Sequence, residues 1–141
     1  GSADGTPFFL KSLCLDFPFA FKSEMDGGVF DAMNKGIKLS SGKFLLFLNS
    51  GDIFASEDVL SKLTPYFSMQ PPRLISGLVE MTYKKSYKIA DLKPWVCHQS
   101  VFVPRSLIKE YMFDEKLRYF GDLDLWKRPQ SGKRIGINAF S

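Results

Sequence analysis

Three sets of polar side chains in this sequence could combine to do chemistry. Asp52 ends the stretch KFLLFLNSGD, His98 stands beside Gln99, and Asp122 opens a short acidic segment that also holds Asp124. An aspartate, a histidine and a second aspartate on separate elements can bind one divalent cation and leave one carboxylate free as a base. Oxygen-rich ligation of this kind suits Mg²⁺ or Mn²⁺, above all where the ligand carries a diphosphate. We therefore expect an enzyme site in which Asp52 anchors a metal or a diphosphate.

Each of these residues also has a purely structural interpretation. Residues 49–52 favour a turn for local reasons, whatever that turn does. A lone histidine such as His98 is more often structural than a ligand. Asp122 could be a plain helix N-cap, which is a common place for aspartate. The residues alone leave both interpretations open.

The element that must position Asp52 is the apolar run before it. Phe44 to Leu48 are all apolar, and turn residues stand at both ends of the run. Such a pattern predicts a strand over Lys43–Leu48 that is buried on both faces, as in a parallel sheet. In open α/β sheets the ligand crevice lies just beyond the carboxyl ends of the strands. Asp52, on a glycine-containing turn, is therefore expected at that crevice.

The remaining elements alternate along the chain, which predicts an α/β fold. Residues 81–93 are weakly patterned and predict a mobile loop or an irregular strand pair. Asp122 falls in the first turn of the last predicted helix, where exposed N–H groups and the helix dipole favour an ionised carboxylate. Helices are predicted over Pro7–Leu15, Asp26–Leu39 (capped by Asp26), Ser56–Phe67, Pro104–Tyr111 and Gly121–Arg128, and further strands over Phe19–Phe21, Leu74–Val79 and Trp95–Val103.

The helix predicted to end at Leu39 carries both an apolar face and polar groups. Phe30, Met33 and Ile37 fall on one side, which predicts that this side packs into the core. Asp31 and Lys35 are four residues apart and face the same way. They form either a surface ion pair, which we favour from the residues alone, or the lining of a polar pocket.

The composition limits the class of protein. The 141 residues, of which 45% are hydrophobic, suffice for a single domain with a core over residues 1–141. No apolar run approaches the length of a bilayer span, and no pattern predicts a signal peptide. Cys14 and Cys97 do not make a disulfide framework, so a reduced cytoplasmic setting is expected. No zinc-ligand spacing, P-loop, G-x-G-x-x-G or G-x-S-x-G motif is present.

The net charge of +4 favours phosphate or polyanion ligands and anionic membrane surfaces, or it reflects only a solvated surface. A nucleic-acid binder is disfavoured, because the chain lacks an aromatic-basic stacking motif. The lysines cluster at Lys84, Lys85 and Lys88, where we expect any peripheral contact with the inner face of a membrane.

Beyond these patterns, several motifs carry a family resemblance. Glu24–Phe54, EMDGGVFDAMNKGIKLSSGKFLLFLNSGDIF, closely resembles the central block of the family 2 GT-A glycosyltransferases, most of all the colanic-acid type of bacterial polysaccharide transferase. The opening GSADGT is similar to the end of that family's DGGS-x-DGT turn, and His98-Gln99 is similar to its HQ pair. Asp114–Arg128 resembles, more loosely, its acidic segment before an aromatic and a basic residue.

The resemblance implies an inverting enzyme with a Rossmann-like GT-A fold, a mixed sheet flanked by helices. It implies a metal-dependent hexosyl transfer from a UDP-, GDP- or dTDP-sugar, with Mg²⁺ or Mn²⁺, to a glycan or lipid-linked acceptor. Asp52 would bind the metal as the surviving aspartate of a DxD-like motif that begins at Asn49, and Asp122 would be the general base. Asp4 would belong to the turn near the nucleotide, Asp26, Asp31, Asn34 and Lys35 would lie by the base, ribose or donor sugar, and His98 and Gln99 would lie near the diphosphate or metal.

The resemblance also has a consequence for the sheet. In the family a strand, a helix and a second strand precede the DGGS turn, and this chain starts after them, so we expect the GT-A sheet to lack that unit. An unprotected sheet edge invites pairing. We therefore expect the chain alone to fold poorly, to pair as a homo-oligomer, or to lack activity. The alternative function is a non-catalytic remnant or binding module without a complete donor pocket.

Overall fold

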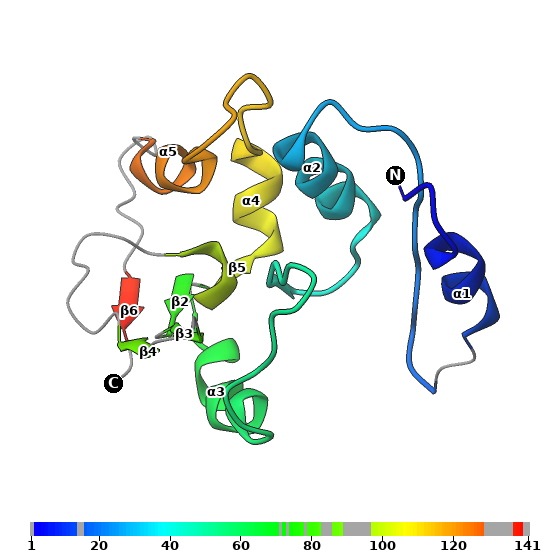
Figure 1. Ribbon diagram of the computed structural model, residues 1–141. Helices are drawn as coiled ribbons and strands as arrows, with labels where there is room; N and C mark the ends of the chain where they lie inside the picture. Colours follow the sequence, from blue (N-terminus) through cyan, green and yellow to red (C-terminus); the bar gives the residue numbers. More distant parts are fainter. Residues whose placement is uncertain are drawn as a thin grey trace.

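The computed structural model of this chain describes residues 2–13, 16–70, 72, 74–77, 79–82, 86–88, 97–128 and 137–139 (Figure 1). These residues form a mixed α/β structure, as the alternating pattern predicts. Lys84 and Lys85 lie outside the described residues, as does the side chain of Lys88, so the expected membrane contact falls there. No helix in the described part of the chain is both long and apolar enough to cross a membrane.

A small mixed sheet forms the centre of the fold. Its strand order is β1-β5-β2-β6, with β5 antiparallel to both β1 and β2, and β2 parallel to β6. The register pairs Leu45 with Val103 and Ile75 with Phe102. The four strands are β1 (Phe44–Leu45), β2 (Leu74–Ser76), β5 (Val101–Pro104) and β6 (Ile137–Ala139), and a separate antiparallel pair joins β3 (Glu80–Thr82) to β4 (Ser86–Lys88).

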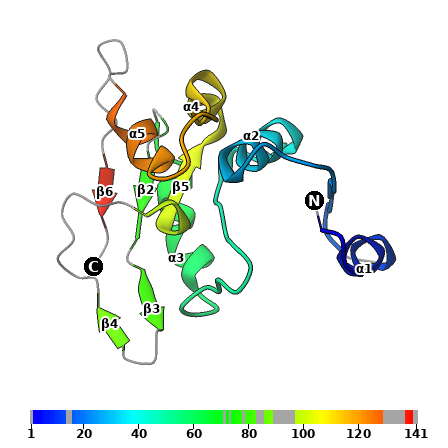
Figure 2. The same cartoon turned by 45° about the horizontal axis from the view of Figure 1, so that its top comes forward.

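The helices lie beside this sheet. In both views α4 lies between α5 and α2, while α1 lies apart, beyond α2 (Figures 1 and 2). No residue of α1 is buried, although Pro7 stands in its first turn as predicted. The helices are α1 (Thr6–Ser12), α2 (Val29–Leu39), α3 (Val59–Phe67), α4 (Arg105–Tyr111) and α5 (Gly121–Lys127), with one 3₁₀ turn, η1 (His98–Ser100).

The core sits where α2 meets the sheet and α4. Phe30, Met33 and Ile37 of α2 are all buried, which confirms the predicted apolar face. The Phe113 ring stacks on Phe30 with centroids 5.5 Å apart and meets Phe47 edge-on at 5.4 Å. The core cluster comprises Phe30, Met33, Ile37, Leu74, Val101, Val103, Ile108, Phe113 and Leu125.

The prediction of a doubly buried parallel strand over Lys43–Leu48 is wrong. The strand is only Phe44–Leu45, it is half-buried, and it pairs antiparallel with β5. Leu46, Phe47 and Leu48 continue outside the ladder, and Phe47 contributes its ring to the core instead. An apolar run predicts that a segment is buried, but it does not identify the partner strand. The direction of strand pairing therefore could not be predicted from this pattern.

Three other element predictions need correction. Phe19–Phe21 forms no strand: its two phenylalanine rings stack on each other at 6.1 Å, and the backbone makes no ladder. The strand predicted over Trp95–Val103 begins only at Val101, because residues 98–100 form a 3₁₀ turn, and residues 95 and 96 lie outside the described chain. The strand predicted to begin at Leu74 ends at Ser76, after which the Gly77 N–H bonds to the Ser100 carbonyl at 2.9 Å.

Candidate functional site

The turn after β1 is fixed by its own aspartate. One Asp52 carboxylate oxygen, Oδ2, accepts the Asn49 backbone N–H at 2.8 Å, and the Asp52 N–H donates to the Asn49 carbonyl at 3.0 Å. Gly51 has φ +92°, a left-handed conformation that glycine adopts without strain. Both Asn49 and Asp52 are exposed. The turn therefore presents a carboxylate and a side-chain amide to the surface, as the sequence predicts.

His98 joins this turn to α5. Its Nε2 atom is 3.3 Å from the Asn49 Nδ2 atom, and its Nδ1 atom is 3.1 Å from Asp122 Oδ2. An amide nitrogen can only donate, so Nε2 accepts and Nδ1 carries the proton that Asp122 accepts. A neutral imidazole in this tautomer satisfies both contacts. The result is a hydrogen-bonded chain, Asn49–His98–Asp122.

Asp122 is the second residue of α5 and is largely buried, with 17% of its side chain exposed. Burial by itself raises the pKa of this carboxyl, but the hydrogen bond from His98 and the Leu123 N–H bond to Oδ1 at 2.9 Å outweigh it, so the pKa of Asp122 is lowered. Asp122 is therefore ionised at neutral pH, as predicted for a carboxylate in the first turn of a helix.

The neighbours of His98 complete the local environment. The Cys97 thiol donates to the Gln99 side-chain oxygen. Burial raises the pKa of the Cys97 thiol, and the negative charges of Asp122 and Asp52 raise it further. The thiol thus experiences a negative field from both carboxylates. Such a field suits a cation more than a bare anion.

The donor groups fit only a sparse metal site. No cluster of three or more His, Cys, Asp or Glu side chains arranged to hold a metal ion occurs among the residues that the structure describes. Both ring nitrogens of His98 are already engaged, so within the predicted trio Asp52 is the exposed carboxylate. Mg²⁺ commonly binds in this way, through one or two carboxylates with substrate phosphates and several waters. Asp52 thus fits a metal that arrives with a diphosphate.

Asp31 and Lys35 form the surface ion pair that we favoured. Lys35 Nζ lies 2.9 Å from Asp31 Oδ2 and 3.2 Å from Glu24 Oε1, and it donates to the Met25 carbonyl at 2.9 Å. Asp31 Oδ2 also accepts the Gly27 N–H at 2.8 Å. That N–H bond, followed by Lys35, lowers the pKa of Asp31. Together these contacts hold the loop before α2 against the helix.

Asn34 is a buried clamp between α2 and the segment that follows α4. Its side-chain Nδ2 donates to the Phe113 carbonyl at 3.0 Å and to Glu115 Oε1 at 2.9 Å, and its Oδ1 accepts the Phe113 N–H at 2.9 Å. Only 2% of Asn34 is exposed. Both ends of the Asn34 amide therefore hydrogen-bond within the fold, and the side chain lies beneath the surface.

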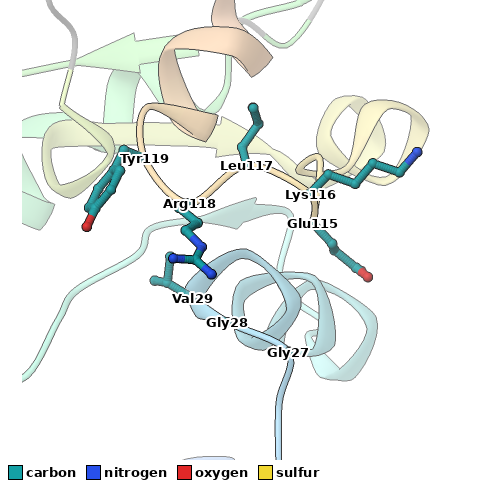
Figure 3. A pocket seen from close by; sticks show the side chains of 8 residues that line it. All are labelled: Gly27, Gly28, Val29, Glu115, Lys116, Leu117, Arg118 and Tyr119. Carbon is teal, nitrogen blue, oxygen red and sulfur yellow. The ribbon is translucent and has the colours of Figure 1, made fainter.

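Gly27–Val29 and residues 115–119 border an open cavity of about 510 Å³ (Figure 3). The start of α2 forms one wall, and the loop before α5 forms the other. Sequence analysis missed these residues, although the run KLRYF places basic and aromatic side chains together just before the acidic helix. The lining residues are Gly27, Gly28, Val29, Glu115, Lys116, Leu117, Arg118 and Tyr119.

The other predicted site residues lie elsewhere. Asp4 is exposed at the start of α1, where its Oδ1 accepts the Thr6 N–H at 2.9 Å. Asp26 is exposed in the loop before α2, and the prediction that it caps this helix is wrong, because the N-cap is Gly28. Asp124 pairs with Arg128, whose NH1 donates to the Tyr111 carbonyl at 2.7 Å. The structure thus gathers Asn49, Asp52, His98, Gln99 and Asp122 in one place, and Asp31, Asn34 and Lys35 in another.

Comparison with known proteins gives partial matches. The chain is 33% identical over 92 residues to a protein named PGL/p-HBAD biosynthesis glycosyltransferase from Mycobacterium bovis (strain BCG / Pasteur 1173P2), a match that covers 60% of this chain and 36% of that protein. A protein of the same name from Mycobacterium tuberculosis (strain ATCC 25177 / H37Ra) matches equally. An uncharacterized glycosyltransferase of Mycobacterium tuberculosis (strain CDC 1551 / Oshkosh) is 39% identical over 72 residues, or 51% of this chain and 27% of that protein.

No family model and no solved structure matches the chain. The chain spans about a third of the length of the curated relatives it matches, 36% for the mycobacterial protein from strain BCG. The relatives share one printed activity, because each is named a glycosyltransferase. The chain is thus similar to part of proteins that are named glycosyltransferases.

Proposed function

We propose that this chain carries the catalytic base and the metal-binding turn of an inverting glycosyltransferase of the family 2 GT-A type. In this proposal a hexosyl group moves from a UDP-, GDP- or dTDP-sugar to a glycan or lipid-linked acceptor. The observation that carries the proposal is the Asn49–His98–Asp122 chain, which brings the turn of Asp52 to the start of α5. The similarity to glycosyltransferases supports the reaction class.

Asp122 has the properties of a general base. Its carboxylate is ionised, and its Oδ2 and Oδ1 accept from His98 and from the Leu123 N–H, which fixes its orientation. In the proposed step Asp122 takes the proton of an acceptor hydroxyl as that oxygen attacks the anomeric carbon. The new carbon–oxygen bond forms while the bond to the diphosphate oxygen breaks, so the nucleoside diphosphate leaves with the electron pair. A single displacement of this kind inverts the anomeric centre.

Asp52 is the residue that would hold a divalent cation together with the donor diphosphate. Its Oδ2 accepts the Asn49 N–H, which fixes the direction in which the carboxylate faces. When bound, Mg²⁺ or Mn²⁺ neutralises the charge that develops on the leaving diphosphate. Asn49 stands between this carboxylate and His98, so the two ends of the reaction are linked by side chains of this chain.

A thermal-shift titration tests the proposal. The chain is melted with UDP, GDP or dTDP, each with and without Mn²⁺, because a ligand that binds only the folded state raises the melting temperature. We expect one nucleotide to raise it in a Mn²⁺-dependent manner, and Asp52→Asn to remove the Mn²⁺-dependent part. A cooperative melt that no nucleotide shifts would replace this proposal with the alternative, a non-catalytic binding module.

A further inference from the structure

We propose that the cavity between α2 and the loop before α5 is a saccharide-binding subsite that holds the acceptor sugar. This proposal rests on the proposed function, because the sugar in the cavity would be the acceptor whose hydroxyl group Asp122 deprotonates. The cavity measures about 510 Å³, within the range of small-molecule sites.

Both walls of the cavity are fixed by hydrogen bonds that lie behind them. Asp31 and Lys35 hold the Gly27 side through the Gly27 N–H and the Met25 carbonyl. Asn34 holds the opposite side through Phe113 and Glu115. All three supporting residues come from α2, so one rigid helix sets the width of the opening. A preformed site loses less conformational entropy when its ligand binds.

The side chains that face the cavity suit a polyol. Arg118 reaches over the start of α2, and the Tyr119 ring lies on the other side of the opening (Figure 3). Among the described residues no hydrogen bond or ion pair engages the Arg118 guanidinium, which offers up to five N–H donors. Tyr119 is 77% exposed and presents an apolar ring with a hydroxyl group. The hydroxyl groups of a sugar can accept hydrogen bonds from Arg118, and its apolar C–H face can pack on the Tyr119 ring.

The charges in the cavity are mixed. The Glu115 carboxylate lines it together with the cationic residues Lys116 and Arg118. The Gly27 N–H already donates to Asp31, so the loop before α2 has lost one donor that an anion would need. Gly27 and Gly28 add no side chain to their wall, which leaves room for a ring. Mixed charge, an exposed aromatic ring and a glycine wall favour a saccharide.

The position of the cavity favours the acceptor over the donor. Tyr119 precedes Asp122 by three residues, so their Cα atoms lie within about 11 Å of each other. Gly121, between them, packs on Phe30 of α2 so closely that a Cβ atom would stand 2.6 Å from the ring. This contact ties the loop, the base and α2 together. A sugar in the cavity is therefore held on the Asp122 side of the site.

Chemical-shift mapping by NMR tests the proposal. The ¹⁵N-labelled chain is titrated with methyl β-glucoside, methyl β-galactoside and methyl α-mannoside, and separately with UDP, GDP or dTDP and Mg²⁺. We expect at least one glycoside to shift the amide signals of Gly27, Gly28, Arg118 and Tyr119, and not those of residues 49–52. Tyr119→Ala and Arg118→Ala should each weaken this binding about tenfold or more, whereas Lys109→Ala, an exposed control on α4, should not change it.

The outcomes separate this proposal from the proposed function. Glycoside shifts confined to residues 49–52, or no shift of the cavity by any glycoside, would overturn the acceptor subsite. Equal binding by Tyr119→Ala, Arg118→Ala and the parent chain would also overturn it. Glycoside binding in the cavity without any nucleotide effect at residues 49–52 would support the sugar subsite and count against the transferase.

Discussion

At the scale of single residues, the site depends on one histidine whose two nitrogens have different partners. One tautomer of His98, with the proton on Nδ1, can accept from Asn49 and donate to Asp122 at the same time. Replacing it would free the Asn49 amide and leave the largely buried Asp122 carboxylate with only the Leu123 N–H. His98 therefore links the turn of Asn49 to the start of α5.

The first prediction concerns Asp122→Asn in the complete enzyme. Asparagine keeps the shape and can still accept from His98 Nδ1, but it cannot take the proton of the acceptor hydroxyl. We expect transfer to fall by roughly 10²- to 10⁴-fold, the usual contribution of a general base, with little loss of nucleotide binding. Steady-state kinetics and a nucleotide titration check this, with Asp124→Asn on the same helix as the control. Undiminished turnover would remove Asp122 from the mechanism.

The second prediction concerns pH. Because the folded state lowers the pKa of Asp122, this carboxyl stabilises the fold at pH values above its unfolded pKa of about 3.9. That stabilisation is lost as the pH falls through the lower pKa of the folded state. The melting temperature of the parent chain should therefore exceed that of Asp122→Asn near neutral pH, and the gap should close in acid. A gap that stays constant between neutral pH and about pH 3 would contradict the role of this carboxylate.

At the scale of elements, α2 is the helix that organises the site. Its apolar face enters the core, while Asp31, Asn34 and Lys35 on its other sides hold the loops that border the cavity. α5 depends on it in turn, because Gly121 lies against the Phe30 ring. The position of Asp122 thus depends on a contact between two helices that are far apart in the sequence. α2 ends at Leu39, and α5 begins at Gly121.

The third prediction uses a matched pair of glycines. In Gly121→Ala the new Cβ would lie 2.6 Å from the Phe30 ring, and the overpacking should cost about 1–3 kcal/mol of unfolding free energy. In Gly36→Ala, in the middle of α2, no atom lies within 4 Å of the new Cβ. This change should stabilise the chain by about 0.5–1 kcal/mol, because alanine favours a helix. Urea unfolding of both variants checks the signs, and stabilisation by Gly121→Ala would contradict the packing.

The fourth prediction concerns Asn34→Ala. The change leaves the buried Phe113 N–H and carbonyl without their amide partners, at about 1–3 kcal/mol for each unsatisfied group. Lys38→Ala, exposed on the same helix, is the control and should change stability by less than about 0.5 kcal/mol. Chemical denaturation measures both variants. Equal stability of Asn34→Ala and the parent chain would show that the Asn34 hydrogen bonds do not stabilise the fold.

At the scale of the whole molecule, polar groups from three segments form one line of hydrogen bonds, and α2 packs beside it. The turn after β1, the turn before β5 and the start of α5 supply the polar groups. The Phe30 ring of α2 lies against Gly121 of α5. α1 stands outside this arrangement, with Asp4 just before it and Phe8 80% exposed. The candidate site therefore belongs to the part of the chain between α2 and α5.

The fifth prediction concerns ligand binding by the molecule as a whole. If the cavity and the Asp52 turn serve one reaction, nucleotide with Mg²⁺ should raise the affinity for a glycoside in the cavity, and the glycoside should raise nucleotide affinity by the same factor. Calorimetric titration of each ligand with and without the other measures both factors. Asn34→Ala, which removes the hydrogen bonds that hold the Glu115 side of the cavity, should reduce the coupling. Identical affinities in the presence and absence of the second ligand would show two independent sites.

Much of the fold could be predicted, and what failed has a common cause. The helices over residues 6–12, 29–39, 59–67, 105–111 and 121–127 follow from periodicity and from proline or acidic residues in their first turns. The strands were less accurate: Phe19–Phe21 has no ladder, and the run after Lys43 keeps only two strand residues. A strand exists only where another strand pairs with it, and composition does not name that partner.

The sequence by itself determined the parts that close within a few residues. These are the Asn49–Asp52 turn, the Asp31–Lys35 pair and the place of Asp122 in the first turn of α5. Only the tertiary structure decided that His98 meets Asn49 and Asp122, which are 49 and 24 residues away, and that Asn34 is a clamp on Phe113, 79 residues away. Local contacts depend on spacing along the chain, whereas these depend on how the strands and helices pack, and packing is a property of all the residues together.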